Sequence, residues 1–580
     1  MGRGPALALL VFAAAGLVAG WKLFLFSTDD AYIAFRYVSN AMAGHGLVWN
    51  PAPFQPVEGY TSFLWVALLW GVWGKFGFEP PAIANWLSLG FGALTLWLVW
   101  RIFARLAWPA AWAGQTRRAL LFACVLVLTL SNRTFLTWLS SGLETAMFNA
   151  WVTWFVLEAV TPPPSGPPAD ARRLLRLSTA AALAALTRPD GLLLVAGAGA
   201  LVALEAWRRR PTLLRQAWPM LALPLHTVWR RATYGEWLPN TYQAKYVEAW
   251  PESGVRYLAS FVLEYGLWVW LALALGWGLR RLRRPPGLEA LLAHAGTWVA
   301  VGVLLGHFGW YTFSNGGDHF EYRVYSHLVP LLALSGVWLA VHGFERPAAT
   351  GAVLVLWLAV SLPIPWVHWQ ATRHLETRAE TVGLALPVAP LFPAPLRPLV
   401  EPWDALQAWL IGHNVGVRHQ EHKVFHRHRT AMLPTREEGA RMRWSERNVF
   451  ADSGVGVVSW VLPGVAILDQ FGLNDRVVAR LPAPPRQGGR QMAHDRLAPT
   501  AYLNCFLPNV HYVDARGRRV PRDFLGSPLP RRGQALETGK LRLAATPREL
   551  TDERIRDCEQ KDWTWAARQQ FGAGAGSPAP

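Results

Sequence analysis

The chain has 580 residues, of which 52% are hydrophobic and only 16% are charged. Soluble domains carry about 25% charged residues, so this composition excludes a disordered protein and a plain soluble enzyme. It points to a polytopic membrane protein with an aqueous portion. The formal net charge is +18. Before that charge is assigned to nucleic-acid binding, the positions of the arginines relative to the membrane have to be considered.

Long apolar runs recur along the chain, and about 20 such residues cross the hydrocarbon core of a bilayer. A cleaved signal peptide is the competing interpretation of the first run, but no A-x-A site precedes Ser27 and many runs follow. We therefore predict about eleven membrane spans. They lie near residues 5–26, 83–104, 119–132, 143–160, 175–187, 191–206, 213–229, 257–278, 288–312, 324–343 and 348–366.

Arginine clusters follow alternate spans, and all of them fall on the cytoplasmic side if the N-terminus is cytoplasmic. The apolar run 61–78 breaks this agreement if it is counted as a span, so we predict a re-entrant or interfacial helix on the outer face. This topology explains most of the net charge and removes the main support for nucleic-acid binding. The clusters are Arg101, Arg105, Arg117 and Arg118; Arg172, Arg173 and Arg176; Arg208, Arg209 and Arg210; and Arg280, Arg281, Arg283 and Arg284.

An odd number of spans places the C-terminus outside, which divides the chain into a membrane domain at 1–370 and an extracytoplasmic domain at 371–580. The second part contains the short runs GVGVVSWVL and GVAIL, which favour strands of a mixed α/β module. Cys505 and Cys558 would share an oxidising compartment there, and both a disulfide and two free thiols stay open. Pro, Gly and Arg enrich 479–490 and 527–533, and the tail 571–580 is predicted to be disordered.

Five histidines lie among basic residues between positions 413 and 428. A metal site and a solvated loop are both compatible with this composition, and we favour the loop. The sequence has no CxxC or Cys/His spacing typical of zinc sites. Four further polar residues of this part fit turn and capping positions as well as glycan contacts. They are Asp452, Asp469, Asn474 and Asp475.

Two adjacent carboxylates, Asp29 and Asp30, directly follow the first span. Charged side chains at a membrane boundary are costly unless they face water, a metal or a substrate. Ser27 or Thr28 suits the N-cap of a helix whose first turn would contain the acidic pair. A favourable helix start and a functional site therefore both stay open at this stage.

Further polar clusters fall on the same predicted outer face. A single charged residue at the end of a span can simply extend its side chain to the membrane–water interface. Several such clusters on one face instead favour a functional site. Besides Glu58 and Tyr60, these clusters lie at residues 140–145, 187–191, 234–245 and 315–319.

Motifs in these clusters, in order along the chain, resemble the GT-C superfamily of polyprenyl-phosphate-dependent glycosyltransferases. The finer resemblance is to the bacterial terminal β-(1→2)-arabinofuranosyltransferase family, and it extends from about residue 27 to residue 500. The segments are STDDAYIAFRYVSNAMAGHGLVWNP, VEGYTSFLW, SGLETAMF, ALTRPDGLLL, YGEWLPNTYQAKY, NGGDHFEYR and ADSGVGVVSWVLPGVAILDQFGLNDR.

The resemblance implies sugar transfer from a polyprenyl-phosphate donor to an envelope glycan or glycolipid, on the outer face of the bacterial cytoplasmic membrane. Asp29 would be the base or orient the acceptor, Asp30 would hold its geometry, and His319 would carry a proton. The donor and its phosphate would contact the other matching residues, although Trp237 is better explained as an interfacial anchor. These residues are Glu58, Tyr60, Arg188, Trp237, Asn240, Lys245, Asp318 and Arg323.

We expect transfer without a metal or another cofactor, although an Asp-Asp pair also suits Mg²⁺ or Mn²⁺. Two other functions are weighed against the enzyme. A non-catalytic envelope or flagellar-motor-associated scaffold with the same fold would be favoured by loss of the acidic pair, which is present. A transporter would show inverted repeats and charges at the bilayer midplane, and the sequence has neither.

Overall fold

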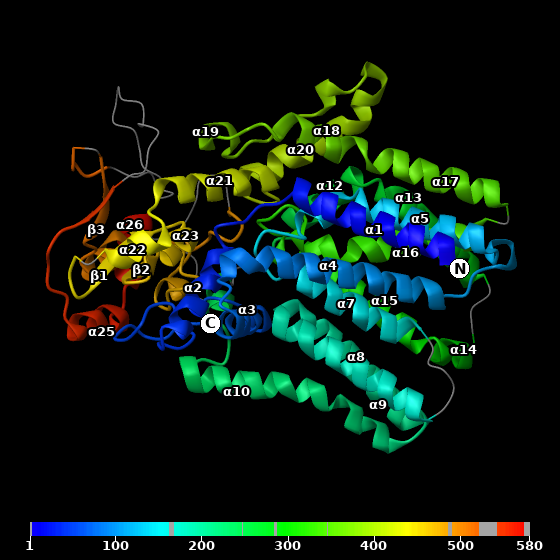
Figure 1. Ribbon diagram of the computed structural model, residues 1–580, viewed down its shortest axis with the longest axis horizontal. Helices are drawn as coiled ribbons and strands as arrows, with labels where there is room; N and C mark the ends of the chain where they lie inside the picture. Colours follow the sequence, from blue (N-terminus) through cyan, green and yellow to red (C-terminus); the bar gives the residue numbers. More distant parts are fainter. Residues whose placement is uncertain are drawn as a thin grey trace.

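The computed structural model describes residues 3–161, 167–245, 248–283, 287–344, 346–442, 444–484, 490–514, 516–520 and 542–572. Helices form a bundle at one end of the molecule, and a smaller α/β part lies at the other end (Figure 1). The segment 527–533, most of the tail 571–580 and the middle of 479–490 lie outside the described residues, so their predictions are not tested.

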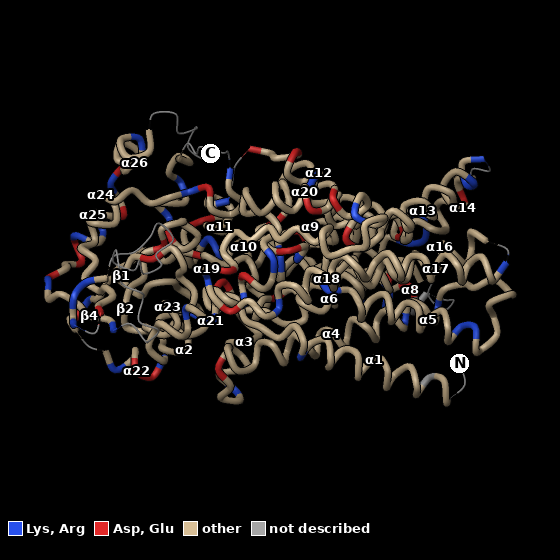
Figure 2. The backbone as a smooth tube through the Cα atoms, turned by 90° about the horizontal axis from the view of Figure 1, so that it is seen from above, with Lys and Arg blue, Asp and Glu red and all other residues tan. Residues whose placement is uncertain are grey.

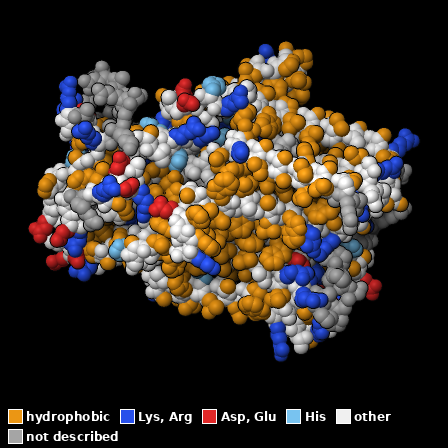
Figure 3. Space-filling view, in the orientation of Figure 1, with side chains coloured by type: hydrophobic (Ala, Val, Ile, Leu, Met, Phe, Trp, Pro, Cys, Tyr) orange, Lys and Arg blue, Asp and Glu red, His pale blue; other side chains and the backbone are white. Residues whose placement is uncertain are grey.

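The bundle is built from helices that are apolar on nearly all sides, as expected for helices that contact lipid and each other. One large core of buried side chains joins them. Apolar side chains cover much of the bundle face in Figure 3, and charged side chains gather toward the two ends. The helices are α1 (Arg3–Leu23), α4 (Pro80–Arg105), α5 (Gln115–Leu130), α6 (Arg133–Thr137), α7 (Thr145–Val160), α8 (Pro167–Thr187), α9 (Leu192–Arg208), α10 (Ala222–Tyr234), α12 (Pro251–Glu264), α13 (Leu267–Leu282), α14 (Leu288–Ala293), α15 (Ala295–Gly309), α16 (Val329–Gly343) and α17 (Pro347–Ser361).

Four helical stretches among the described residues are long and apolar enough to cross a membrane: Pro80–Arg105, Pro189–Arg208, Arg323–Gly343 and Pro347–Thr372. A fifth is added if α12 and α13 count as one broken span, since they meet at 96°. The span predicted over 257–278 corresponds to this bent pair, in which Gly266 adopts a left-handed φ of 56° at the junction, and a single span there stays a prediction. Helical membrane architecture is supported, and the number of about eleven spans stays a prediction.

Three of the predicted arginine clusters include the C-terminal ends of α4, α9 and α13. These ends lie at the end of the bundle that is remote from the strands (Figure 1). Blue stretches of the tube mark Lys and Arg positions at the same end in Figure 2. The clusters therefore share one end of the bundle, as the topology requires, and the identity of that end as cytoplasmic stays a prediction.

Helix α3 (Phe63–Phe76) corresponds to the apolar run that we did not count as a span. Its 14 residues extend over about 21 Å, short of the ~30 Å of hydrocarbon that a span has to cross. It packs against α2 (Ala31–Met42). Because α2 begins at Ala31, the acidic pair precedes the helix, and the prediction that it lies in the first turn is wrong.

Two predictions for the α/β part, a strand and a solvated loop, are wrong. GVGVVSWVL forms helix α23 (Val455–Val461) instead of a strand, whereas GVAIL forms strand β2 (Val465–Asp469) as predicted; β2 pairs in parallel with β1 (Asn448–Asp452). The histidine-rich run is mostly helix α21 (His419–Met432), with His419 and His422 buried, so the solvated loop is wrong. The other elements of this part are α19 (Arg378–Thr381), α20 (Arg397–Gly412), α22 (Arg436–Arg441), α24 (Thr500–Cys505), β3 (Val510–Val513), β4 (Arg542–Ala545), α25 (Asp552–Gln560) and α26 (Thr564–Phe571), with β3 and β4 antiparallel. Two more helices, α11 (Asn240–Lys245) and α18 (Pro363–Thr372), belong to the preceding part of the chain.

The chain between α1 and α4 (residues 24–79), which we call the first loop, shares one hydrophobic core with the α/β part. Arg36 of α2 is fully buried at this junction and donates hydrogen bonds to five backbone carbonyl oxygens. Four of these belong to the α/β part, so a side chain near the N-terminus fixes the chain around α23. The five oxygens are those of Trp49, Ser459, Leu462, Pro463 and Val465. The division of the chain at residue 370 stays a prediction.

Cys505 and Cys558 form a disulfide between α24 and α25, and Cys124 is free. The bond closes a sequence separation of 53 residues. Of the two possibilities that the sequence left open, a disulfide and two free thiols, the structure has the disulfide.

We predict that replacing Cys505 and Cys558 by alanine lowers the free energy of unfolding by about 2–4 kcal/mol, because the unfolded chain gains freedom. Thermal unfolding of the detergent-solubilised protein measures this, with Cys124→Ser as the matched control. Titration of the unreduced, denatured wild type should find one thiol, and three thiols would contradict the disulfide.

Candidate functional site

Asp29 and Asp30 have different environments although they are neighbours. Asp29 is only 4% exposed. Its Oδ2 accepts a hydrogen bond from the backbone N–H of Gly456 and its Oδ1 one from that of Val457, both at 2.9 Å. Asp30 is exposed, and within the described residues its carboxylate has no partner. The structure therefore favours the reverse of the roles we expected, with Asp29 holding geometry and Asp30 available to react.

Burial raises the pKa of Asp29 to about 6, against the opposing effects of Arg429 and the two backbone N–H donors. Each oxygen of the Asp29 carboxylate is engaged with a backbone N–H group and the side chain is buried, so it is held in place and shielded from an incoming hydroxyl, whereas Asp30 is open to one. This geometry gives a physical reason why Asp29 is the structural member of the pair.

One cation, Lys245, interacts electrostatically with Asp30. Lys245 at the end of α11 is exposed and forms no ion pair within the part of the chain that the structure describes. It interacts electrostatically with Asp30, Asp318, Arg188 and Arg323. The side chains of Lys245, Arg188, Arg323, Asp30 and Asp318 thus form one cluster, which we call the ionic cluster.

The two arginines of the ionic cluster are already paired. Arg188 lies 3.1 Å from Asp190 and 3.6 Å from Glu144. Arg323 lies 3.0 Å from Asp318. Lys245 is consequently the cation of the cluster whose charge is not matched by a carboxylate in direct contact.

His319 is beside the ionic cluster, but its environment does not suit a proton carrier at neutral pH. Its Nδ1 lies 3.0 Å from the carbonyl oxygen of Asn414. Burial lowers the pKa of His319 to about 4. The ring is therefore neutral at pH 7, and the structure argues against the role that we expected for it.

Three of the expected sugar-binding residues hold the fold together instead. Glu58 is buried and forms an ion pair with Arg230. The hydroxyl of buried Tyr60 lies 3.1 Å from that of Tyr234. The amide of Asn240 donates to the carbonyl oxygens of Gly472 and Leu473, both at 2.9 Å, and so joins α11 to the α/β part.

Trp237 has the exposure expected of an interfacial anchor. Its side chain is 57% exposed, and the guanidinium of Arg231 lies 5.8 Å from the ring centre. An exposed indole with a neighbouring cation is compatible with the membrane interface, and it places no polar atom in the ionic cluster.

Sequence reasoning missed two partners of the ionic cluster. Tyr311 accepts a hydrogen bond from Arg188 at 3.0 Å, and Glu144 forms the longer ion pair with the same arginine. Glu144 lies in the SGLET motif, so its presence was visible in the sequence. Its pairing was not, because 44 positions separate it from Arg188 and no local pattern links the two helices.

The arrangement of acidic and imidazole groups offers no metal centre in the described ranges, where no group of three or more His, Cys, Asp or Glu side chains could hold a metal ion. We derive no chemical step through a metal.

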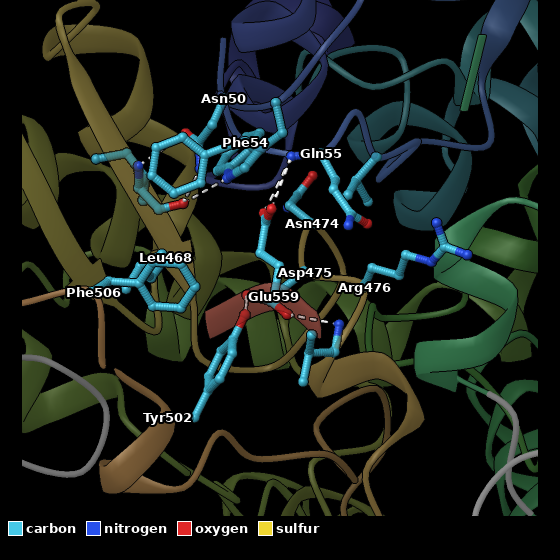
Figure 4. A pocket seen from close by; sticks show the side chains of 14 residues that line it. Asn50, Phe54, Gln55, Leu468, Asn474, Asp475, Arg476, Tyr502, Phe506 and Glu559 are labelled. Carbon is cyan, nitrogen blue, oxygen red and sulfur yellow. Dashed lines mark hydrogen bonds between the residues drawn. The ribbon is translucent and has the colours of Figure 1, made fainter. Parts of the chain in front are cut away.

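A small cavity lies between the first loop and the α/β part (Figure 4), and none of its lining residues belongs to the ionic cluster. Both carboxylate oxygens of Glu559 lie 3.2 Å from the backbone nitrogen of Gln55, and Tyr502 donates to Asp475 at 2.7 Å. The free space is about 20 Å³, room for roughly one water. In this conformation the cavity is too small for a sugar ring.

Comparison with known proteins finds two curated relatives, both described as terminal β-(1→2)-arabinofuranosyltransferases. The chain is 30% identical over 390 residues to the protein from Mycobacterium tuberculosis, covering 59% of this chain and 58% of that protein. It is 29% identical over 343 residues to the protein from Corynebacterium glutamicum, covering 54% and 48%. The chain thus matches about half the length of each relative, and the resemblance read from its motifs is confirmed.

Among solved structures, the crystal structure of ArnT from Cupriavidus metallidurans bound to undecaprenyl phosphate is similar at a TM-score of 0.46 and 15% sequence identity. The match covers 80% of this chain and 85% of that chain. No family model matches the chain.

We predict that Asp29→Ala lowers the free energy of unfolding by about 1–3 kcal/mol for each backbone N–H that loses its acceptor. Asp30→Ala should change it by no more than about 0.5 kcal/mol, as expected of an exposed side chain. Thermal unfolding of both variants measures the difference. Equal stability of the two variants would contradict the structural role of Asp29.

A second prediction concerns pH. Burial raises the pKa of Glu559 to about 8, above the value of about 4.3 in an unfolded chain. The protonated form therefore favours folding, and this contribution is lost as pH rises through about 8. Glu559→Gln keeps an acceptor for the Gln55 N–H but cannot ionise, so the unfolding temperature of the variant minus that of wild type should grow between pH 5 and pH 8. A difference that is independent of pH would contradict the raised pKa.

Proposed function

We propose that this chain is a membrane glycosyltransferase of the GT-C type. In this proposal it moves a sugar from a polyprenyl-phosphate donor to an envelope glycan or glycolipid, on the outer face of the bacterial cytoplasmic membrane. The observation that carries the proposal is the exposed carboxylate of Asp30 near the ammonium of Lys245, neither of which has an ion-pair partner among the described residues. The printed descriptions of the two relatives supply the reaction class and the suggestion of arabinofuranose.

Asp30 would act as the general base. Its carboxylate accepts the proton of the acceptor hydroxyl while the oxygen of that hydroxyl attacks the anomeric carbon of the donor. The bond between the anomeric carbon and the phosphate oxygen breaks, and the lipid phosphate leaves with the electron pair. Asp29 keeps Asp30 in place through its two backbone hydrogen bonds and takes no proton from the substrate.

Lys245 would stabilise the negative charge that develops on the departing phosphate. An ammonium with no carboxylate in contact offers its full charge to that group. Arg188 and Arg323 are already balanced by carboxylates, so they would shape and orient the site more than they add charge. The three cations, which the sequence did not distinguish, thus have different roles in this proposal.

The larger organisation belongs to the same proposal. About eleven spans would carry the site to the outer face, and residues 371–580 would form an extracytoplasmic part that positions the acceptor. Burial of Arg36 and Asp29 against α23 supports a close association of this part with the first loop.

The test is a transfer assay with the purified full chain, a panel of polyprenyl-phosphate sugars that includes arabinofuranose, and a glycan extract from envelopes. Asp30→Asn should lower the transfer rate by about 10²–10⁴-fold, because the amide cannot accept the proton. The exposed Asp557→Asn in α25 is the matched control and should keep the wild-type rate. Full activity of Asp30→Asn would overturn Asp30 as the base, and a wild type that binds and consumes no donor would favour the scaffold.

Lys245→Met should separate binding from chemistry in the same assay. Loss of the ammonium is expected to lower kcat about 10²–10³-fold, as for loss of another preorganised donor at developing charge. Lys561→Met, a change of the same type at an exposed site in the α/β part, is the control. An unchanged kcat for Lys245→Met would remove Lys245 from the site.

A further inference from the structure

The partners of Asp29 come from the far end of the chain. Gly456 and Val457, which donate to its carboxylate, lie 427 and 428 residues away. They lie in the first turn of helix α23 (Val455–Val461), after the turn at residues 453–454 that follows strand β1. The conformation of this turn therefore decides whether Asp29 has its two donors.

A buried ion pair fixes the turn. Arg429 of α21 lies 2.7 Å from the Asp452 carboxylate, and the same nitrogen donates to the carbonyl oxygen of Gly454 at 2.9 Å. The other oxygen of Asp452 accepts from the N–H groups of Ser453 at 2.8 Å and Gly454 at 3.3 Å. Arg429 and Asp452 thus hold both ends of the turn, and both side chains are buried.

Gly456 is at a point of very close approach. A Cβ atom added there would lie 1.8 Å from the backbone carbonyl oxygen of Asp29 and 2.8 Å from its Oδ2. Only a residue without a side chain lets α23 come close enough for its N–H groups to reach the carboxylate. By contrast, a Cβ added at Gly464, which follows α23, meets no atom within 4 Å.

We infer that Arg429, Asp452 and Gly456 are positioning residues for Asp30: they hold the turn that clamps Asp29, and Asp29 fixes the backbone from which Asp30 reaches the ionic cluster. Asp30 is the next residue, and its carbonyl oxygen accepts from the Ile33 N–H of α2 at 3.2 Å. A shift of the turn therefore moves the start of α2. This inference rests on the proposed function, because it assigns the three residues to the reaction of that site.

The test compares Gly456→Ala with Gly464→Ala in the full chain. Gly456→Ala has to push α23 away from Asp29, and a displacement of about 1 Å at a reacting group can cost about 100-fold in rate. We expect kcat to fall by about that factor while the KM for the donor changes less than about twofold. Gly464→Ala should keep wild-type kinetics. Equal kcat for the two variants would overturn the inference.

Hydrogen–deuterium exchange of the peptide that contains residues 27–34 gives a readout that does not need turnover. Exchange there should rise in Gly456→Ala and stay unchanged in Gly464→Ala. If the wild type transfers no sugar, the proposed function fails, yet a rise confined to Gly456→Ala still supports the clamp. Unchanged exchange in both variants would overturn the clamp even in an active enzyme.

A milder variant covers the case in which Gly456→Ala does not fold. Arg429→Lys keeps the charge beside Asp452 but cannot bond both Asp452 and Gly454 in the same way. We expect about a tenfold loss of kcat at an unchanged donor KM, with Arg447→Lys, an arginine of the same part that pairs with Asp552, as the control. If Arg429→Lys and Arg447→Lys lose the same activity, the role of Arg429 is only structural and the inference fails.

Discussion

The contacts of the buried Asp29 carboxylate determine how the segment after α1 is joined to the α/β part. Moving a carboxylate out of water is costly, and the cost is offset here by two backbone N–H donors and by the nearby charge of Arg429. Arg36, seven positions further along, is buried with five carbonyl oxygens around its guanidinium. Opposite charges of one loop are therefore both satisfied by backbone groups, which ties the first loop to the chain around α23.

Such backbone partners explain why sequence reasoning could name the acidic pair but could not divide the roles between its members. The composition, the apolar runs and the acidic pair were enough to predict a helical membrane body with chemistry beside its first span. Nothing local distinguishes Asp29 from Asp30, because the difference is made by N–H groups of Gly456 and Val457. The same holds for Glu58 and Asn240, whose polar side chains join segments that are remote in the sequence.

The α/β part shows where tertiary structure overrides local preference. GVGVVSWVL is rich in β-branched residues and favours a strand by propensity, yet it forms α23. Arg36 donates hydrogen bonds to the carbonyl oxygens of Ser459 and Leu462 near the C-terminal end of α23. Asp29 accepts hydrogen bonds from N–H groups near the start of α23. Both ends of the helix thus find partners in the first loop, which a strand would not provide. The disulfide and the buried histidines of α21 likewise follow from packing that the sequence pattern does not reveal.

The distance in sequence between Asp29 and its donors also imposes an order on biosynthesis. A ribosome makes the acidic pair within the first thirty residues and the turn before α23 more than four hundred residues later. Until that late segment has been made and has packed, Asp29 is a carboxylate without its two donors, and the neighbouring carboxylate has no fixed position. A nascent chain stalled between these points therefore holds an unassembled site, so the last third of the polypeptide sets the moment at which the protein matures.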